Sequence, residues 1–147
     1  MDDQTLLTPQ QIGTDCVCLN TQRAARALAR RYDAALRPIE LTSGQFAILA
    51  GLNQEGSASI GALADGLGLE RTTLTRNLLP LEADGLIRSA PGDGDKRVRG
   101  LTLTAQGRAK LALAMPLWRA AQADTIDRLA PHGWADIRPA LDQLASI

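Results

Sequence analysis

The sequence predicts a mainly α-helical protein, and its composition and its periodicity support that fold class. Of the 147 residues, 45% are hydrophobic but only 3% are aromatic, so the core must consist chiefly of leucine and alanine. Such a core suits packed helices better than stacked sheets, because strands favour aromatic and β-branched side chains. Apolar residues also recur at helical spacing, as in Leu28, Tyr32 and Leu36. The length fits one globular unit with its own core.

Two helices are expected in the first third of the chain. Residues 1–10 are polar and are expected to be loose, and a helix is expected over 12–37, where Pro38 ends it. The stretch LTSGQF begins the next helix, because Thr42 can cap the backbone N–H of Gln45 and the Gln45 side chain can reach back.

Two helices joined by a glycine turn follow. Ser59 is placed to cap a helix over 60–67, Gly68 makes the turn, and GLERTTLTRNLLPLEADG is typical of an amphipathic helix with Leu74 at the centre of its buried side. The opposite side carries the polar residues Thr72, Thr73, Thr75 and Arg76. This is the helix-turn-helix arrangement, in which arginine can bind guanine or phosphate and threonine can contact phosphate or thymine. Taken alone, the segment fits an ordinary surface helix equally well.

A basic β-hairpin is expected directly after this helix. Residues 86–89 and 98–103 have the pattern of two short strands around a turn rich in glycine and aspartate. The turn and the second strand carry the basic residues Lys96, Arg97 and Arg99. An arginine at such a tip can enter a minor groove of DNA, and Asp95 would hold the tip by pairing with a nearby arginine or with backbone N–H groups. Helix, turn, helix and basic hairpin in this order predict a DNA-binding winged helix-turn-helix.

The distribution of charge agrees with an anion-binding surface. The net charge of the whole chain is zero, yet residues 70–110 contain eight basic and five acidic side chains, whereas residues 111–147 contain three basic and four acidic ones. Positive charge is therefore concentrated around the predicted helix over 68–85, called the reading helix below, and around the hairpin that follows it. This is expected for a surface that binds a nucleic acid.

The segments outside this unit indicate a partner chain. Thr104 is placed to cap a long helix, and the apolar residues of 134–144 recur at helical spacing in a last one. Neither end is needed to complete a winged helix, so an identical partner with two-fold symmetry is expected to cover them. We therefore expect an N-terminal dimerisation helix over 1–40, a DNA-binding lobe over 41–104 and C-terminal dimerisation helices over 105–147.

Other classes of function find little support in the sequence. Cys16 and Cys18 cannot form a disulfide framework, the N-terminus lacks a signal-peptide pattern and no apolar run approaches ~20 residues, so a cytoplasmic protein without a membrane span is expected. His132 has no nucleophile or cluster of metal ligands to work with, so no catalytic residue, cofactor or metal is expected. A winged-helix dimer that binds protein instead of DNA stays open as an alternative.

With this layout, the sequence resembles the MarR family of bacterial transcriptional regulators over residues 16–144. The stretches that carry the resemblance are LTSGQFAILAGL, SIGALADGLGLERTTLTRNLLPLEADGLI and GDKRVRGLTLTAQGR. The resemblance implies a homodimer that binds a pseudo-palindromic DNA site and is most often a repressor released by a small molecule. By the resemblance, Arg97 is the minor-groove arginine, Asp95 supports it, and the major-groove face consists of Thr72, Thr73, Thr75 and Arg76. The further basic residues that we expect to contact DNA are Arg71, Lys96 and Arg99.

Two features depart from the family pattern. The hairpin turn over 92–94 lacks an arginine that many members have there, which makes its tip more flexible and lowers its positive charge. Leu79 stands on the outward side of the reading helix, where a polar residue is common.

Two kinds of signal remain open, because family members respond to small phenolic or aromatic acids or to oxidants. On one helix, Cys16 and Cys18 would point about 200° apart, so they are not expected to share a metal or a disulfide. In the hydroperoxide-sensing branch of the family, a tyrosine follows a reactive cysteine by fourteen residues, and Cys18 and Tyr32 match that spacing. The second tyrosine of that branch is replaced by Gln22, and a buried cysteine is more often a small hydrophobe.

For an organic effector, the resemblance implies a pocket between the dimer helices and the DNA-binding lobe. The candidate lining residues are Asn20, Arg23, Phe46 and Trp118.

Overall fold

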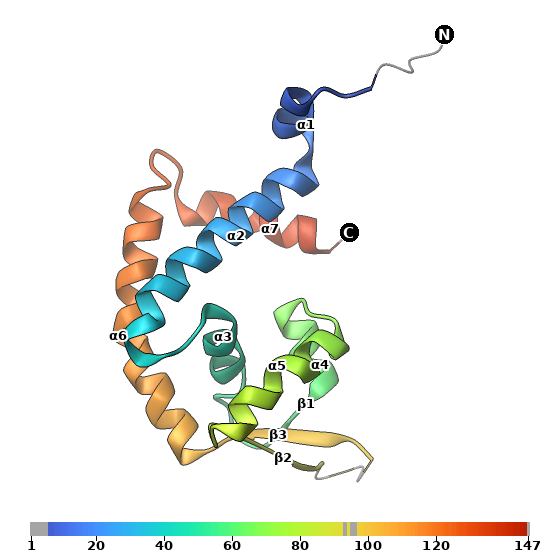
Figure 1. Ribbon diagram of the computed structural model, residues 1–147, viewed down its shortest axis with the longest axis vertical. Coiled ribbons are helices and arrows are strands. Elements are labelled where there is room, and N and C mark those ends of the chain that lie inside the picture. Colours follow the sequence, from blue (N-terminus) through green and yellow to red (C-terminus); the bar gives the residue numbers. More distant parts are fainter. Residues whose placement is uncertain (1–5, 93, 95–96, 147) are drawn as a thin grey trace.

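The computed structural model describes residues 6–92, 94 and 97–146 and contains two parts joined by one long helix (Figure 1). The elements in chain order are α1 (Pro9–Asp15), α2 (Val17–Leu36), the 3-10 helix η1 (Arg37–Ile39), α3 (Ser43–Gly51), β1 (Ala58–Ser59), α4 (Ile60–Leu67), α5 (Arg71–Ala83), β2 (Ile87–Pro91), β3 (Arg99–Leu103), α6 (Ala105–Asp127) and α7 (Trp134–Ala145). The helices α3, α4 and α5 and the strands form a lobe at one end, α1, α2 and α7 lie at the other, and α6 connects the two. The predicted mainly helical fold is confirmed.

The core of the lobe determines which face of α5 is turned outward. Leu74 and Leu81 are 0% exposed and Leu78 is 3% exposed, and all three belong to one apolar cluster with Ile48 and Leu49 of α3. Burying a leucine side chain contributes about 1.5–3 kcal/mol, so rotating α5 about its axis would cost several such contacts. The predicted buried side of the reading helix is confirmed.

The sheet has three antiparallel strands in the order β1-β3-β2. In the predicted hairpin, Ile87 pairs with Leu103 at one end and Pro91 pairs with Arg99 at the other. The predicted hairpin is confirmed, and a third short strand that the sequence analysis did not predict extends it, since Ala58 of β1 pairs with Leu101 of β3. A strand of two residues is too short to produce the alternation by which strands are found in a sequence.

The predicted N-terminal helix is divided in two. The first part, α1, begins at Pro9, in a stretch that was expected to be loose, because Thr8 and Gln11 form a capping box. The backbone N–H of Gln11 donates to Thr8 Oγ1 at 3.2 Å, and the N–H of Thr8 donates to Gln11 Oε1 at 2.9 Å. The same spacing starts α3 at Thr42 and Gln45, as predicted.

The break between α1 and α2 lies at Cys16, whose backbone is extended with φ −79° and ψ 106°. Its Sγ accepts the backbone N–H of Leu19 at 3.4 Å and so caps α2. The Asn20 side chain donates to the carbonyl oxygens of Gly13 and Cys16, at 3.0 Å each, which closes the junction. Cys16 and Cys18 therefore do not lie on one continuous helix, and the expectation that their side chains point about 200° apart loses its basis.

The residues directly after the reading helix α5 pack closely against the start of α6. Thr104 caps α6 as predicted, since the N–H of Gly107 donates to its Oγ1 at 2.9 Å, and the Thr104 hydroxyl donates in turn to the carbonyl oxygen of Gly85 at 2.7 Å. Gly107 packs so tightly that a Cβ atom there would lie 2.0 Å from the carbonyl oxygen of Leu86.

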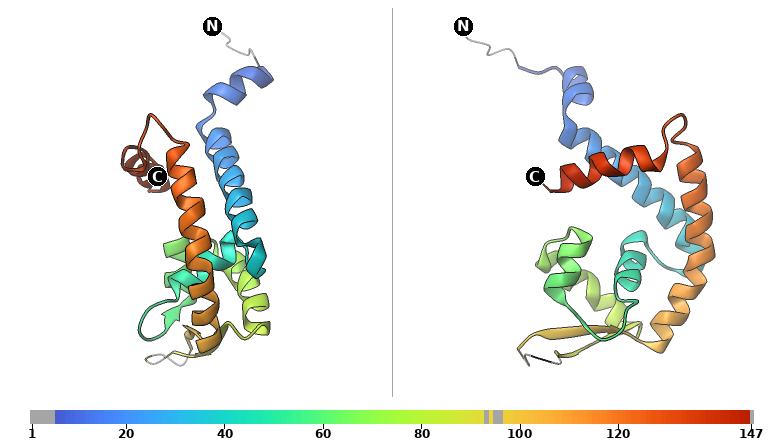
Figure 2. Two further views of the ribbon diagram at one scale, coloured as in Figure 1. Left: turned by 90° about the vertical axis from the view of Figure 1, so that its left-hand side faces the viewer. Right: turned by 180° about the vertical axis from the view of Figure 1, so that it is seen from behind.

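The helices α2 and α6 lie side by side (Figure 2). Polar contacts join them: Arg31 pairs with Asp124 and donates from Nε to Thr125 Oγ1 at 3.1 Å, and the Tyr32 hydroxyl donates to Gln122. These contacts attach the N-terminal end of the molecule to the long helix that leads to the lobe.

The terminal helices lack a core of their own. All residues of α1 and α7 are described, and none of them is buried. The exposed large apolar side chains of this end are Leu6, Leu7, Ile12, Val17, Leu28, Trp134, Leu141 and Leu144. A monomeric protein rarely exposes so many large apolar side chains at one end of the molecule.

Candidate nucleic-acid interface

The helix α5 presents a polar face to solvent. Of the four residues predicted to form that face, Thr73 is half-buried, and the exposed ones are Thr72, Thr75 and Arg76. The Thr75 hydroxyl donates to the carbonyl oxygen of Arg71 at 2.8 Å, so its proton is already used within the helix. Towards a ligand, Thr75 can offer its oxygen as an acceptor or its methyl group. Leu79 is 60% exposed, as expected from its outward position.

The wing is the hairpin formed by β2, β3 and the turn between them. Within that turn, the N–H of Gly92 donates to the carbonyl oxygen of Val98 at 2.6 Å, and the side chain of Arg97 is exposed. Asp95 and Lys96 lie outside the described residues. The support of Arg97 by Asp95 and the part played by Lys96 therefore stay predictions.

Arg99 links the wing to the last turn of α5. Its Nε donates to Ser89 Oγ at 2.7 Å, and its Nη2 lies 3.6 Å from Glu82 Oε1. Because the Arg99 side chain is 59% exposed, this ion pair contributes less than about 1 kcal/mol to stability, and its main effect is on the orientation of the hairpin. Arg99 was predicted from its charge as a DNA contact, and the structure gives it a positioning role as well.

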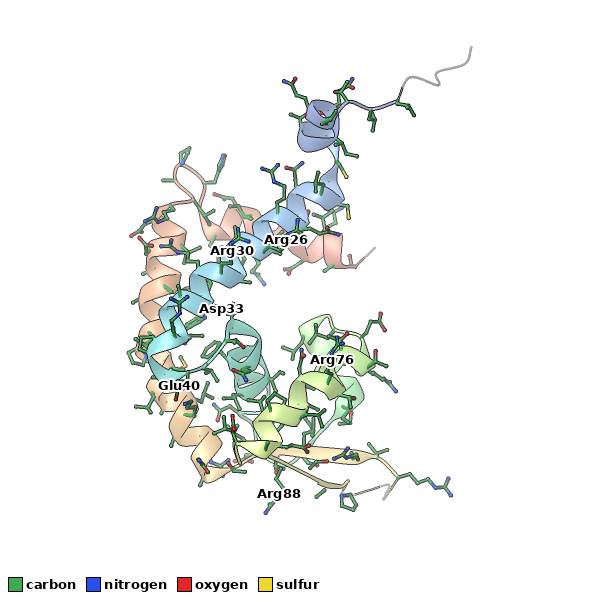
Figure 3. All side chains as sticks on the ribbon, viewed as in Figure 1. Arg26, Arg30, Asp33, Glu40, Arg76 and Arg88 are labelled. Atoms are coloured by element: carbon green, nitrogen blue, oxygen red, sulfur yellow. The ribbon has the colours of Figure 1, made fainter. Side chains whose placement is uncertain are left out.

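Two arginines of the lobe project from opposite sides (Figure 3). Arg76 extends from α5, and Arg88 extends from the outer face of the sheet. Side chains alternate along a strand, so Arg88 faces away from its neighbour Ser89, which contacts Arg99 on the side of α5. The basic residues of the hairpin are thus divided between two surfaces.

The candidate pocket residues are distributed over two regions. Phe46 and Trp118 stack on each other between α3 and α6, with ring centroids 5.8 Å apart and planes inclined by 19°. Asn20 closes the junction of α1 and α2, and Arg23 lines a shallow groove on α2.

A separate hollow of about 470 Å³ lies where the start of α3, the end of α5 and α6 meet. No sequence pattern points to it, because it is formed by three elements distant in the chain. Its polar lining residues are Glu40, Gln45, Asp84, Gln106 and Lys110.

The two cysteines differ in exposure. Cys16 is half-buried at the helix break, whereas Cys18 is exposed and its Sγ accepts from Gln22 Nε2 at 3.3 Å. Tyr32, which matches Cys18 by spacing, donates its hydroxyl to Gln122 of α6. Among the described residues, no group of three or more His, Cys, Asp or Glu side chains could hold a metal ion. In the same part of the chain, no helix has the length and apolar character needed to cross a membrane.

Comparison with known proteins identifies the family of this winged helix. Residues 41–98 match the model of the MarR family. The crystal structure of the Mycobacterium tuberculosis transcriptional regulator MosR in complex with DNA is 42% identical, with a TM-score of 0.81 over 90% of this chain and 95% of that one. The chain belongs to the MarR family.

Two further relatives agree with this assignment. The HTH-type transcriptional repressor Rv2887 of Mycobacterium tuberculosis is 30% identical over 124 residues, which are 84% of this chain and 89% of that protein. The HTH-type transcriptional regulator TtmR of Methylorubrum extorquens is 35% identical over 100 residues, or 68% of this chain, and the match spans only 51% of TtmR. This MarR-family chain is a DNA-binding transcriptional regulator, and the names of its relatives are those of transcriptional regulators and repressors.

Proposed function

We propose that this MarR-family regulator is a homodimer that represses genes near its own by binding a pseudo-palindromic operator, and that a small molecule releases it. The observation that carries the proposal is the polar outward face of α5, held in place by three buried leucines on the opposite side. The name of the relative Rv2887, a transcriptional repressor, supports repression over activation.

The residues of this face have distinct roles in the proposal. Arg76 reads a guanine in the major groove, since a guanidinium can bond both acceptors of that base. Thr72 and Thr73 contact phosphate oxygens or thymine methyl groups, whereas Thr75, whose hydroxyl proton is used within the helix, contacts a thymine methyl group. Arg97 enters the adjacent minor groove from the wing. The remaining basic residues of the interface, which contact the phosphate backbone, are Arg71, Lys96 and Arg99.

The dimer is supported by the apolar side chains at the end opposite the lobe. Leu141 and Leu144 of α7 are 39% and 40% exposed, and Ile12 of α1 is 41% exposed. Covering these side chains with a second copy would remove them from water and would place two reading helices on one duplex, as a palindromic site requires.

Negative charges placed on the apolar side of α7 should prevent dimerisation. The double variant Leu141→Asp, Leu144→Asp should be monomeric by light scattering, where the unaltered protein has the mass of two chains, and should lose at least about tenfold in operator affinity. Leu113→Asp, at an equally apolar position of α6 that is 60% exposed, is the matched control and should remain dimeric. A double variant that stays dimeric and binds fully would refute this interface.

The chemistry of the 470 Å³ hollow fits a small phenolic or aromatic acid as the effector. Lys110 offers a cation for a carboxylate, Glu40 and Asp84 can accept from a phenolic hydroxyl, and Leu41 and Leu86 supply apolar walls. The hollow lies at the joint between α6 and the lobe, where a bound molecule would change the angle of the reading helix.

Oxidation of Cys18 is the second candidate signal, favoured by its exposure and by its place in the first turn of α2. One operator-binding assay separates the two signals. If the effector is a phenolic acid, 4-hydroxybenzoate should lower the affinity and a trace of organic hydroperoxide should not. If the signal is oxidation, hydroperoxide should abolish binding and Cys18→Ser should restore it. Binding that neither reagent alters would contradict both.

A further inference from the structure

The side chain of Arg71 lies against the first turn of the neighbouring helix, at Gly61. A Cβ atom built on Gly61 of α4 would lie 2.9 Å from Nη2, 3.2 Å from Cζ and 3.5 Å from Nε of Arg71. Carbon atoms in contact are normally about 3.5–4.0 Å apart, so the guanidinium occupies the space that any side chain at position 61 would need. The absence of a side chain at Gly61 is what allows this position of Arg71.

In this arrangement the positive charge of Arg71, a residue of α5, lies next to α4. Arg71 is the first residue of α5 and is exposed. Over residues 6–92, 94 and 97–146, no ion pair includes Arg71, so no carboxylate of that part of the chain neutralises its charge. The guanidinium therefore stands beside the outward face of α5, not within it.

We infer that Gly61 is a positioning residue for DNA binding: because it has no side chain, it leaves room for the guanidinium of Arg71 to lie across the helix-turn-helix, where Arg71 contacts a phosphate of the DNA backbone. The inference rests on the operator binding proposed above. A phosphate is the expected partner because groups beside a reading helix contact the backbone, whereas the side chains of its outward face reach the base edges. Arg71 then adds affinity without adding sequence preference.

The structure offers a matched pair of substitutions on α4. Gly61→Ala adds a methyl group that must displace the end of the Arg71 side chain, which is flexible enough to move without disturbing the backbone. Gly66→Ala is the control, because a Cβ at Gly66 meets nothing within 4 Å. Both substitutions give the same helix the same gain in helical propensity, so a difference between them reports on the position of Arg71.

The expected results concern affinity for the operator and for an unrelated duplex, measured at several salt concentrations. Gly61→Ala should weaken both by roughly three- to tenfold, whereas Gly66→Ala should stay within about twofold of the unaltered protein. Arg71→Ala should weaken both by roughly tenfold and lower the salt slope by about one, and adding Gly61→Ala to it should change nothing further. Arg71→Ala tests the phosphate contact without any change on α4.

Three outcomes would overturn the inference. They are a Gly61→Ala protein that binds like Gly66→Ala, a Gly61→Ala effect that persists in the Arg71→Ala background, and an Arg71→Ala protein with unchanged affinity and salt slope. Arg76→Ala in the same assay separates a failure of this inference from a failure of the proposed operator binding. If Arg76→Ala weakens binding while Gly61→Ala and Arg71→Ala do not, the positioning role of Gly61 and the phosphate contact of Arg71 both fail, but the proposed reading face of α5 stands. If Arg76→Ala also has no effect, that reading face fails as well.

Discussion

Replacing Arg76 or Arg97 with alanine should weaken operator binding by about 1–3 kcal/mol for each substitution. Arg76 is exposed on the outward face of α5, where it would lose a bidentate bond to guanine, and Arg97 is exposed in the turn of the wing, where it would lose a minor-groove contact. Fluorescence anisotropy with a labelled operator measures the change. Arg97→Ala should also lower the salt slope, because a guanidinium in the narrow groove displaces counterions.

Arg88→Ala is the matched control for both arginine substitutions. It removes the same charge from the same lobe, but Arg88 projects from the outer face of the sheet, on the opposite side from Arg76 (Figure 3). Its operator affinity should stay within about threefold of the unaltered protein at moderate salt. If Arg88→Ala cost as much as Arg76→Ala, the losses would report only net charge, and the assignment of a reading face would be wrong.

Gly107→Ala should be strongly destabilising, because the space for a side chain at this position is already occupied by backbone. The added Cβ would lie 2.0 Å from the carbonyl oxygen of Leu86 and 2.8 Å from Cδ1 of Leu103, and backbone cannot move aside as a flexible side chain can. We expect the free energy of unfolding to fall by about 3 kcal/mol and Tm by roughly 5–10 °C. Thermal unfolding followed by circular dichroism measures both quantities.

Gly44→Ala is the control for this substitution, because Gly44 also lies in the first turn of a helix but a Cβ there meets nothing within 4 Å. Its Tm should equal or exceed that of the unaltered protein, since alanine favours a helix. A Gly107→Ala protein as stable as Gly44→Ala would show that α6 can move away from the end of α5, and the rigid joint between them would be refuted.

Local patterns in the sequence were sufficient to predict most of the fold. The spacing of Leu74, Leu78 and Leu81 predicted the buried side of α5, and Thr42, Ser59 and Thr104 predicted three helix starts, because caps and amphipathic faces depend on residues within a few positions of one another. The start of α1 was missed although Thr8 and Gln11 have the capping pattern. The break at Cys16 was missed because cysteine is not among the residues that usually cap a helix.

Contacts between distant elements could not be predicted in the same way. The pairing of Arg99 with Glu82 depends on how the wing crosses α5, and the contact of Arg71 with Gly61 depends on how α5 crosses α4. Neither has a fixed spacing in the sequence. The residue types of the candidate site were therefore predictable from charge and periodicity. The distribution of its arginines over the outward face of α5, the contact with Glu82, the contact with Gly61 and the outer face of the sheet (Figure 3) was not predictable.

Binding of a dimer to an operator is tested by mixing the purified protein with the intergenic DNA next to its own gene and measuring the affinity and the mass of the complex at the same time. Two chains should occupy one protected pseudo-palindromic site, at an affinity at least about 10³-fold tighter than for an unrelated duplex of equal length. Equal affinity for the two duplexes, or a single chain on the site, would contradict operator binding by a dimer.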